Sequence, residues 1–213
     1  MAIDPQSERV FVANGTIVSV LNTRTGLLEQ TIVVGAGDAM GLLVAQNARR
    51  LFVATDDSTV AVFDADSGRL VSSSRTMHSS PVAMADDERL GHVFVVNADG
   101  FGQPVVGSVS MFDARTGTML RTTPVGKIAK AIAVDQSSSR VFVVNAADGS
   151  VSVLDARSGR LLRSIVVGGH PLAVVVDERT GRAVVVADGG ERDLAGWGNP
   201  APPPRVSVLD ATR

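Results

Sequence analysis

The residues of this chain best suited to chemistry are two histidines and two clusters of acids. His78 and His170 each stand near a proline, and a histidine can act as a metal ligand or as a base near neutral pH. The acids form the clusters Asp56-Asp57 and Asp86-Asp87-Glu88. Paired carboxylates do acid and base work only when they lie roughly 5–10 Å apart. Any chemistry therefore depends on which elements bring these groups together.

Other familiar reactive arrangements are absent from the sequence. No cysteine is present, which excludes disulfides, thiolate metal sites and cysteine nucleophiles. No serine lies in a Gly-x-Ser-x-Gly turn, and the glycines at 35–37 and 168–169 are too short a signal for a phosphate loop. No spacing of His, Asp and Glu supplies a full set of metal ligands. We therefore predict no catalytic residue, no metal and no cofactor.

The elements that position these groups belong to a repeat of about 42 residues. The apolar segments that follow a basic residue are spaced by 41, 42, 48 and 42 residues. They start at Val10, Leu51, Val93, Val141 and Ala183. A continuous repeat without linkers predicts a single domain over 1–213. Its units lie near 2–40, 41–81, 82–129, 130–171 and 172–213.

Each unit is expected to hold four short strands, named A to D in chain order. In the fourth unit they are 131–135, 140–145, 150–155 and 161–167, all rich in valine and isoleucine. Small antiparallel sheets that are apolar on both faces bury themselves by stacking radially. The fold class is therefore all-β, and the expected architecture is a β-propeller of four-stranded antiparallel blades. A parallel β-solenoid is the alternative.

Three segments resemble the signature of the YVTN-type β-propeller repeat, with phenylalanine in place of tyrosine. They are Phe94-Val-Val-Asn97, Phe142-Val-Val-Asn145 and Phe11-Val-Ala-Asn14. The resemblance implies a propeller, usually of about seven blades. The YVTN-type repeat belongs to a superfamily that includes lactonase-like hydrolases, surface proteins and subunits of redox enzymes. The fifth unit departs from the pattern, because Ala187 replaces the asparagine.

The two ends of the repeat array are incomplete. The last unit stops after strand C, and only 2–4 represent strand A of the first unit. Two interpretations stay open: a ring of five blades whose last blade has three strands, or part of a larger ring of about seven blades. An open array would expose apolar blade faces and favour self-association.

One end of the expected propeller carries most of the sequence variation. The B–C and D–A connections emerge there, and both long insertions, 97–107 and 188–205, are B–C loops. Because loops vary without disturbing the blades, we expect binding at this end. The predicted ligand-binding residues are Asp38, His78, Phe101, Lys127, His170, Asp193 and Trp197. Trp197 has a second interpretation, in which it folds back to cover the fifth blade.

The remaining polar groups have structural interpretations. His92 aligns with an arginine at the start of strand B in the other units, so we predict a structural role. The two acid clusters fall at opposite ends of the blades and are expected to be solvated turns.

Composition limits the partners. The net charge is -2 with both signs interspersed, which favours neither nucleic acid nor a membrane surface. We expect a protein, peptide or small-molecule partner. The first nine residues show no charged leader with an apolar core, so no signal peptide is expected, although many relatives in the family are exported. The leading hypothesis is a non-enzymatic binding scaffold. The alternatives are a lactonase-like hydrolase and a structural or electron-transfer subunit.

Overall fold

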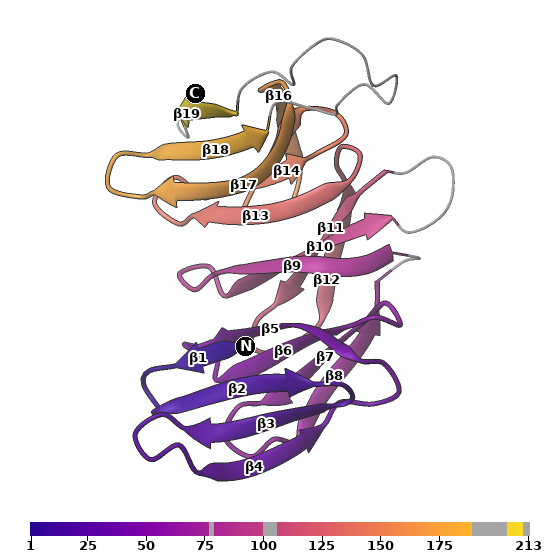
Figure 1. Ribbon diagram of the computed structural model, residues 1–213, viewed down its shortest axis with the longest axis vertical. Coiled ribbons are helices and arrows are strands. Elements are labelled where there is room, and N and C mark those ends of the chain that lie inside the picture. Colours follow the sequence, from indigo (N-terminus) through magenta and orange to yellow (C-terminus); the bar gives the residue numbers. More distant parts are fainter. Residues whose placement is uncertain (77–78, 100–105, 189–203, 211–213) are drawn as a thin grey trace.

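The described part of the chain folds into five antiparallel sheets (Figure 1). The computed structural model describes residues 1–76, 79–99, 106–188 and 204–210. In each sheet the strands pair with their neighbours in chain order, so every sheet is a simple meander. Among these residues no helix could cross a membrane. The all-β prediction is confirmed, and the five sheets are called blades 1 to 5.

The strand bounds follow the repeat. Blade 1 contains β1 (Ala2–Asp4), β2 (Arg9–Asn14), β3 (Ile17–Asn22) and β4 (Leu28–Val33). Blade 2 contains β5 (Ala39–Ala45), β6 (Arg50–Thr55), β7 (Thr59–Asp64) and β8 (Leu70–Arg75). Blade 3 contains β9 (Ser79–Asp87), β10 (His92–Asp99), β11 (Ser108–Asp113) and β12 (Met119–Pro124). Blade 4 contains β13 (Ala129–Asp135), β14 (Arg140–Asn145), β15 (Ser150–Asp155) and β16 (Leu161–Val166). Blade 5 contains β17 (His170–Asp177), β18 (Arg182–Asp188) and β19 (Arg205–Asp210).

The blades form an open arc along their first strands. The A strands of consecutive blades pack side by side in the order β1, β5, β9, β13 and β17. Blades 1 and 5 lie at opposite ends of this arc (Figure 1). Within the described residues their strands make no extensive contact with each other. The fold is therefore not a closed ring of five blades in this structure.

Each blade is apolar on both faces, and blades 2 to 4 are each buried between two neighbours. Along β14, Phe142 and Val144 face blade 5, whereas Val141 and Val143 face blade 3. All four side chains are fully buried. The same position of strand B is filled by a fully buried ring in the first four blades, at Phe11, Phe52, Phe94 and Phe142. Stacking of these faces forms four separate apolar layers rather than one central core.

The signature asparagine of blade 4 ties two of its strands to the preceding connection. Asn145 Nδ2 donates to the hydroxyls of Ser150 at 3.1 Å and Ser152 at 3.0 Å. Its Oδ1 accepts a hydrogen bond from the backbone of Gly126 at 3.1 Å. All of this lies inside the sheet stack, where an unmade hydrogen bond is costly. The small residue of strand C, Ser152, therefore accepts a hydrogen bond in addition to allowing close packing.

Side chains at the outer edge link each blade to the next. Hydroxyl or amide groups on strand D donate to a carbonyl in the C–D turn of the following blade. The pairs are Gln30 to Ser67 at 2.8 Å, Ser72 to Gly117 at 3.0 Å and Thr123 to Gly159 at 2.7 Å. A Cβ at Gly117 would lie 2.1 Å from Ser72 Oγ, so these turns require glycine for close approach as well as for positive φ. Contacts between blades are therefore local and repeated.

Candidate functional site

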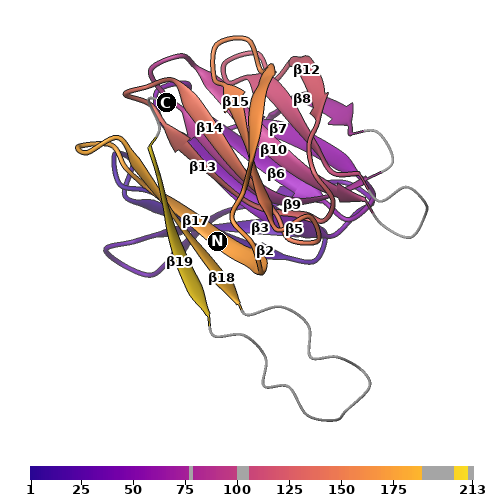
Figure 2. The ribbon, with the colours of Figure 1, turned by 90° about the horizontal axis from the view of Figure 1, so that it is seen from above.

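The B–C and D–A connections lie together at one end of the blades, here called the loop face. The D–A connections that enter blades 2 and 4 are each tied to the B–C turn of that blade. The backbone of Asp38 donates to Asp56 at 2.8 Å, and the backbone of Lys127 donates to Asp148 at 2.7 Å. These two turns thus hold the residues that lead into β5 and β13. Figure 2 views the blades from above.

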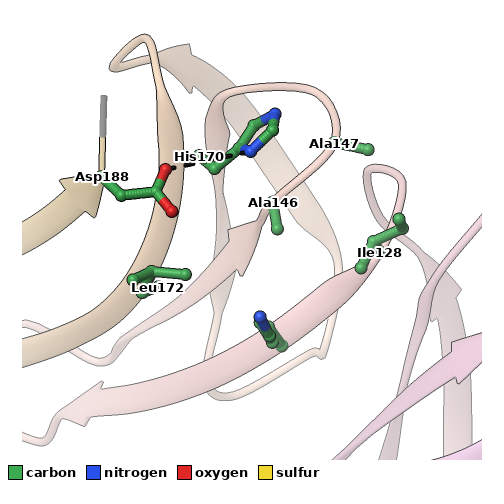
Figure 3. A pocket seen from close by; sticks show the side chains of 7 residues that line it. Ile128, Ala146, Ala147, His170, Leu172 and Asp188 are labelled. Atoms are coloured by element: carbon green, nitrogen blue, oxygen red, sulfur yellow. Dashed lines mark ion pairs between the residues drawn. The ribbon is translucent and has the colours of Figure 1, made fainter. Parts of the chain in front are cut away.

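A pocket of about 250 Å³ opens between blades 4 and 5, at the start of their A strands (Figure 3). Its lining combines apolar and ionisable side chains. The lining residues are Ile128, Lys130, Ala146, Ala147, His170, Leu172 and Asp188. Ile128 and Leu172 are respectively 44% and 40% exposed, which leaves apolar surface open to a ligand. A concave apolar wall with a few polar groups is the usual form of a small-ligand site.

β-Bulges place two of these side chains in the pocket. The pairing of β13 with β14 shifts between Ala129 and Ala131, so Lys130 is the extra residue of a bulge. The pairing of β17 with β18 shifts between Pro171 and Ala173, which makes Leu172 the corresponding residue. A bulged residue leaves the alternation of its strand, and both side chains are exposed.

The same irregularity recurs at the start of the A strands of blades 2 and 3. Met40 lies at the shift between Ala39 and Gly41, and Val82 lies at the shift opposite Val96 and Asn97. Met40 is 66% exposed and Val82 is 48% exposed. Because the A strands pack side by side, the bulges present a row of side chains along the inner end of the loop face. The row consists of Met40, Val82, Lys130 and Leu172.

The polar groups of the pocket come from facing positions of one sheet. His170 and Asp188 are opposite each other in the register of β17 and β18. His170 Nδ1 lies 3.8 Å from Asp188 Oδ1, and the two groups form an ion pair when the ring is protonated (Figure 3). Lys130 adds a second cationic group on the neighbouring A strand. The pocket can therefore form an ion pair with either a negatively or a positively charged group of a ligand.

Glycines allow blades 4 and 5 to approach each other beside the pocket. Gly169 has a φ of +61°, and a Cβ there would lie 2.3 Å from the carbonyl oxygen of Asp188. Gly149 has a φ of +57°, and its Cβ would lie 3.0 Å from the carbonyl oxygen of Gly169. Both glycines are therefore needed for their backbone conformation and for the close approach of the two blades.

The structure places three of the predicted binding residues on the loop face. His170 lines the pocket, and the exposed Lys127 lies directly before the pocket residue Ile128. Asp38 is exposed at the entry to blade 2 and does not line this pocket. The other predicted residues lie outside the described part of the chain; they are His78, Phe101, Asp193 and Trp197. Whether any of the seven binds a ligand stays a prediction.

Sequence reasoning missed the remaining pocket residues. Lys130 and Leu172 were not predicted, because the regular alternation of side chains along a strand does not indicate where a bulge lies. Asp188 could have been found, since the hairpin of β17 and β18 places it opposite His170. Within the described residues, no group of three or more His, Asp or Glu side chains is arranged to hold a metal ion.

The opposite end of the blades holds the second acid cluster, and one expectation about it was wrong. Asp87 is fully buried rather than solvated. Its Oδ1 accepts a hydrogen bond from the backbone of Leu90 at 2.9 Å, but no described residue donates to its Oδ2. In blades 1 and 4 a serine of the A–B turn fills this role, with Ser7 donating to Asp4 and Ser138 donating to Asp135, both at 2.6 Å. Leu90 has no hydroxyl, so the turn of blade 3 leaves the carboxylate short of one donor.

Asp86, the neighbour of Asp87, occupies an apolar position of the repeat. In blades 2, 4 and 5 a valine holds this position before the A–B turn and contacts an apolar layer. These valines are Val44, Val134 and Val176. Burial, together with the nearby charges of Glu88 and Asp87, raises the pKa of Asp86 to about 6. The acid clusters do lie at opposite ends, so they form no carboxylate pair for acid and base work.

His92 has the structural role that its alignment predicts. Its Nδ1 lies 2.9 Å from the carbonyl oxygen of Ala156 in the next blade. Arg50 starts strand B in blade 2 and donates in the same way to the carbonyl of Arg115 at 3.0 Å. The histidine therefore links two blades.

Comparison with known proteins identifies the architecture. No protein-family model matches the chain, and no curated protein matches it. Among solved structures, the hydrazine synthase of Kuenenia stuttgartiensis superposes with a TM-score of 0.73 over 87% of this chain. The fold is a β-propeller. The sequences are 14% identical and the match covers 54% of that chain, so the likeness concerns the fold alone.

Proposed function

We propose that this propeller is a non-enzymatic scaffold that binds a small amphiphilic ligand or a peptide at its loop face. The observation that carries the proposal is the pocket between blades 4 and 5, with exposed Ile128 and Leu172 beside His170, Lys130 and Asp188. An apolar wall favours burial of an apolar group, and the ionisable side chains orient a charged one.

The row of bulged residues supports a binding surface that extends beyond the pocket. Met40 and Val82 expose apolar side chains at the same position of blades 2 and 3 that Leu172 occupies in blade 5. Exposed apolar residues that align along one edge of a molecule are typical of interaction surfaces. A peptide laid across the A strands would contact the row in order.

We also propose that the repeats belong to the YVTN type. The bonded asparagines of blades 3 and 4 support this assignment. Asn97 Nδ2 donates to Ser110 at 3.0 Å, as Asn145 does to Ser152. The repeat type carries no particular activity with it, so the ligand follows from the loop face rather than from the blades.

A ligand screen tests the proposed site. Aryl and alkyl carboxylates, chosen for an apolar body with a charged end, are titrated into ¹⁵N-labelled protein. The amide signals of 128–130, 146–147, 170 and 172 should shift together. Leu172→Asp should weaken binding by about tenfold or more, because it places a charge on the apolar wall.

A matched control makes that result specific. Leu162 is 48% exposed on β16, away from the pocket lining, so Leu162→Asp should leave the affinity unchanged. Signals that shift elsewhere, or an affinity that Leu172→Asp does not alter, would remove the pocket as the site.

A further inference from the structure

Each of the four contacts between blades joins the same two surfaces. The front face of a blade is the one toward the next blade in the chain, and the back face is the one toward the preceding blade. Between blades 4 and 5, the front face contributes Phe142, Val144, Val151 and Val153. The back face of blade 5 packs against them with Val174, Ala183 and Val185, among others. The other blade contacts repeat this arrangement.

The front face of blade 5 carries the same apolar pattern, but no described strand covers it. Register places Val175, Val184 and Val208 in one row and Ala173, Val186 and Val206 in the next. Val175, Val206 and Val208 are 63%, 67% and 58% exposed. The residues at the corresponding positions of blade 4 include Phe142, Val151 and Val153, which are fully buried. A contiguous apolar face of this kind marks an interaction surface.

The back face of blade 1 is the matching open surface. Val10 and Val12 on β2 point away from blade 2, and Ile3 on β1 pairs beside Val10. Ile3 is 52% exposed, and Val10 and Val12 are both partly exposed. In blades 2 to 5 the equivalents of Val10 and Val12 are fully buried; they are Leu51 and Val53, Val93 and Val95, Val141 and Val143, and Ala183 and Val185.

These two open surfaces are the halves of one further blade contact. The four existing contacts show what covers a front face of this repeat, namely the back face of another blade of the same repeat. Blades 1 and 5 of one molecule lie at opposite ends of the arc, so they do not cover each other. We propose that the chain associates head to tail with a second copy, the front face of blade 5 packing on the back face of the second copy's blade 1.

The polar edge of the repeat supports this geometry. At the start of strand B, Arg50 and His92 each reach a backbone carbonyl in the C–D turn of the next blade. Arg182 holds the same position in blade 5 and is exposed. In the head-to-tail dimer its guanidinium meets the C–D turn of the second copy's blade 1, at 22–26. The contact is heterologous, so the assembly either closes into a ring or extends as a filament.

Two substitutions on different faces test the proposal. Val206→Glu disables the front face, and Val12→Glu disables the back face, because each places a charge in an apolar contact. Mass is measured by light scattering over a range of concentrations, and thermal unfolding verifies that each variant folds. We expect the wild-type chain to exceed its monomer mass of 22.1 kDa as concentration rises. Each variant alone should stay a monomer, with affinity reduced about a hundredfold or more.

Mixing the variants gives the decisive result. Val206→Glu keeps an intact back face and Val12→Glu keeps an intact front face, so an equal mixture should form a dimer and nothing larger. Leu162→Glu, on exposed β16, should associate like the wild type. Should Val12→Glu fail to fold, Ile3→Glu replaces it. A wild-type monomer at every concentration, a single variant that still associates, or a mixture that stays monomeric would each overturn the proposal.

Discussion

Blade 4 and blade 5 contain the same repeat in two different environments. Blade 4 has four strands and a neighbour on each side, and its central residues Phe142 and Asn145 are fully buried. Blade 5 has three described strands and one neighbour, and the same positions hold Val184 and Ala187. The valines of its front face are largely exposed. The same apolar pattern is therefore buried in blade 4, where a second blade covers it, and exposed on the front face of blade 5.

The largest expected difference concerns the aromatic position of strand B. Phe142→Ala should lower the free energy of unfolding by about 3–5 kcal/mol, because it leaves a cavity between blades 4 and 5. In protein dilute enough to stay monomeric, Val184→Ala at the same position of blade 5 should lower it by roughly 1 kcal/mol or less, since Val184 is only partly buried in the single chain. Denaturant unfolding of both variants measures the difference. A loss of about 2 kcal/mol or more from Val184→Ala would show that another surface covers blade 5 under these conditions.

The next effect concerns the signature asparagine. Asn145→Ala removes two hydrogen bonds to serines and one from Gly126, and should cost about 1–3 kcal/mol. Ala187→Asn restores the signature in blade 5, where Ser207 still stands at the position of Ser152. It should change the free energy of unfolding by less than about 1 kcal/mol, because blade 5 has Arg205 where blade 4 has Ser150. Chemical denaturation with both variants tests whether the asparagine acts through its partners.

The smallest effect extends the comparison to blade 3, whose Asp86 departs from the valine of blades 2, 4 and 5. Its pKa of about 6 lies above its ordinary value of 3.8, so the folded state binds this proton more tightly than the unfolded state. The penalty from Asp86 is therefore absent well below pH 3.8, grows as pH rises from 3.8 to about 6, and is complete above that. Asp86→Val should raise the free energy of unfolding by roughly 1–2 kcal/mol at pH 8.

Thermal unfolding at two pH values verifies this sign. The gain in Tm from Asp86→Val should be larger at pH 8 than at pH 5, where the wild-type group is largely protonated in the folded state. Asp86→Asn serves as the control that removes the charge without adding apolar surface. A gain that is the same at both pH values would assign the effect to packing alone.

Most of the fold could be predicted from the sequence because its signals are local. Strands B and C of blade 4 were predicted at 140–145 and 150–155, as observed. Strand A begins at Ala129 rather than 131, because the bulge at Lys130 lies within the strand. Strand D ends at Val166, one residue earlier than predicted. Alternating valines and turn glycines fix these elements without reference to distant residues.

The candidate site was harder to predict because it depends on irregularities and on contacts between blades. His170 was singled out as a histidine, but its pocket partners Lys130 and Leu172 are there only because two bulges turn them out of the sheet. The missing donor to Asp87 Oδ2 follows from Leu90 in the turn, where blades 1 and 4 have a serine hydroxyl. Neither feature leaves a periodic signal in the sequence.

The hydrogen bonds at the outer edge have a consequence for biosynthesis. Gln30, Ser72 and Thr123 each donate from one blade to a turn of the blade that follows in the chain. During translation, a finished blade therefore offers donors and an apolar surface to the segment that emerges next from the ribosome. The array can form progressively from its amino terminus, with each unit serving as a template for its successor.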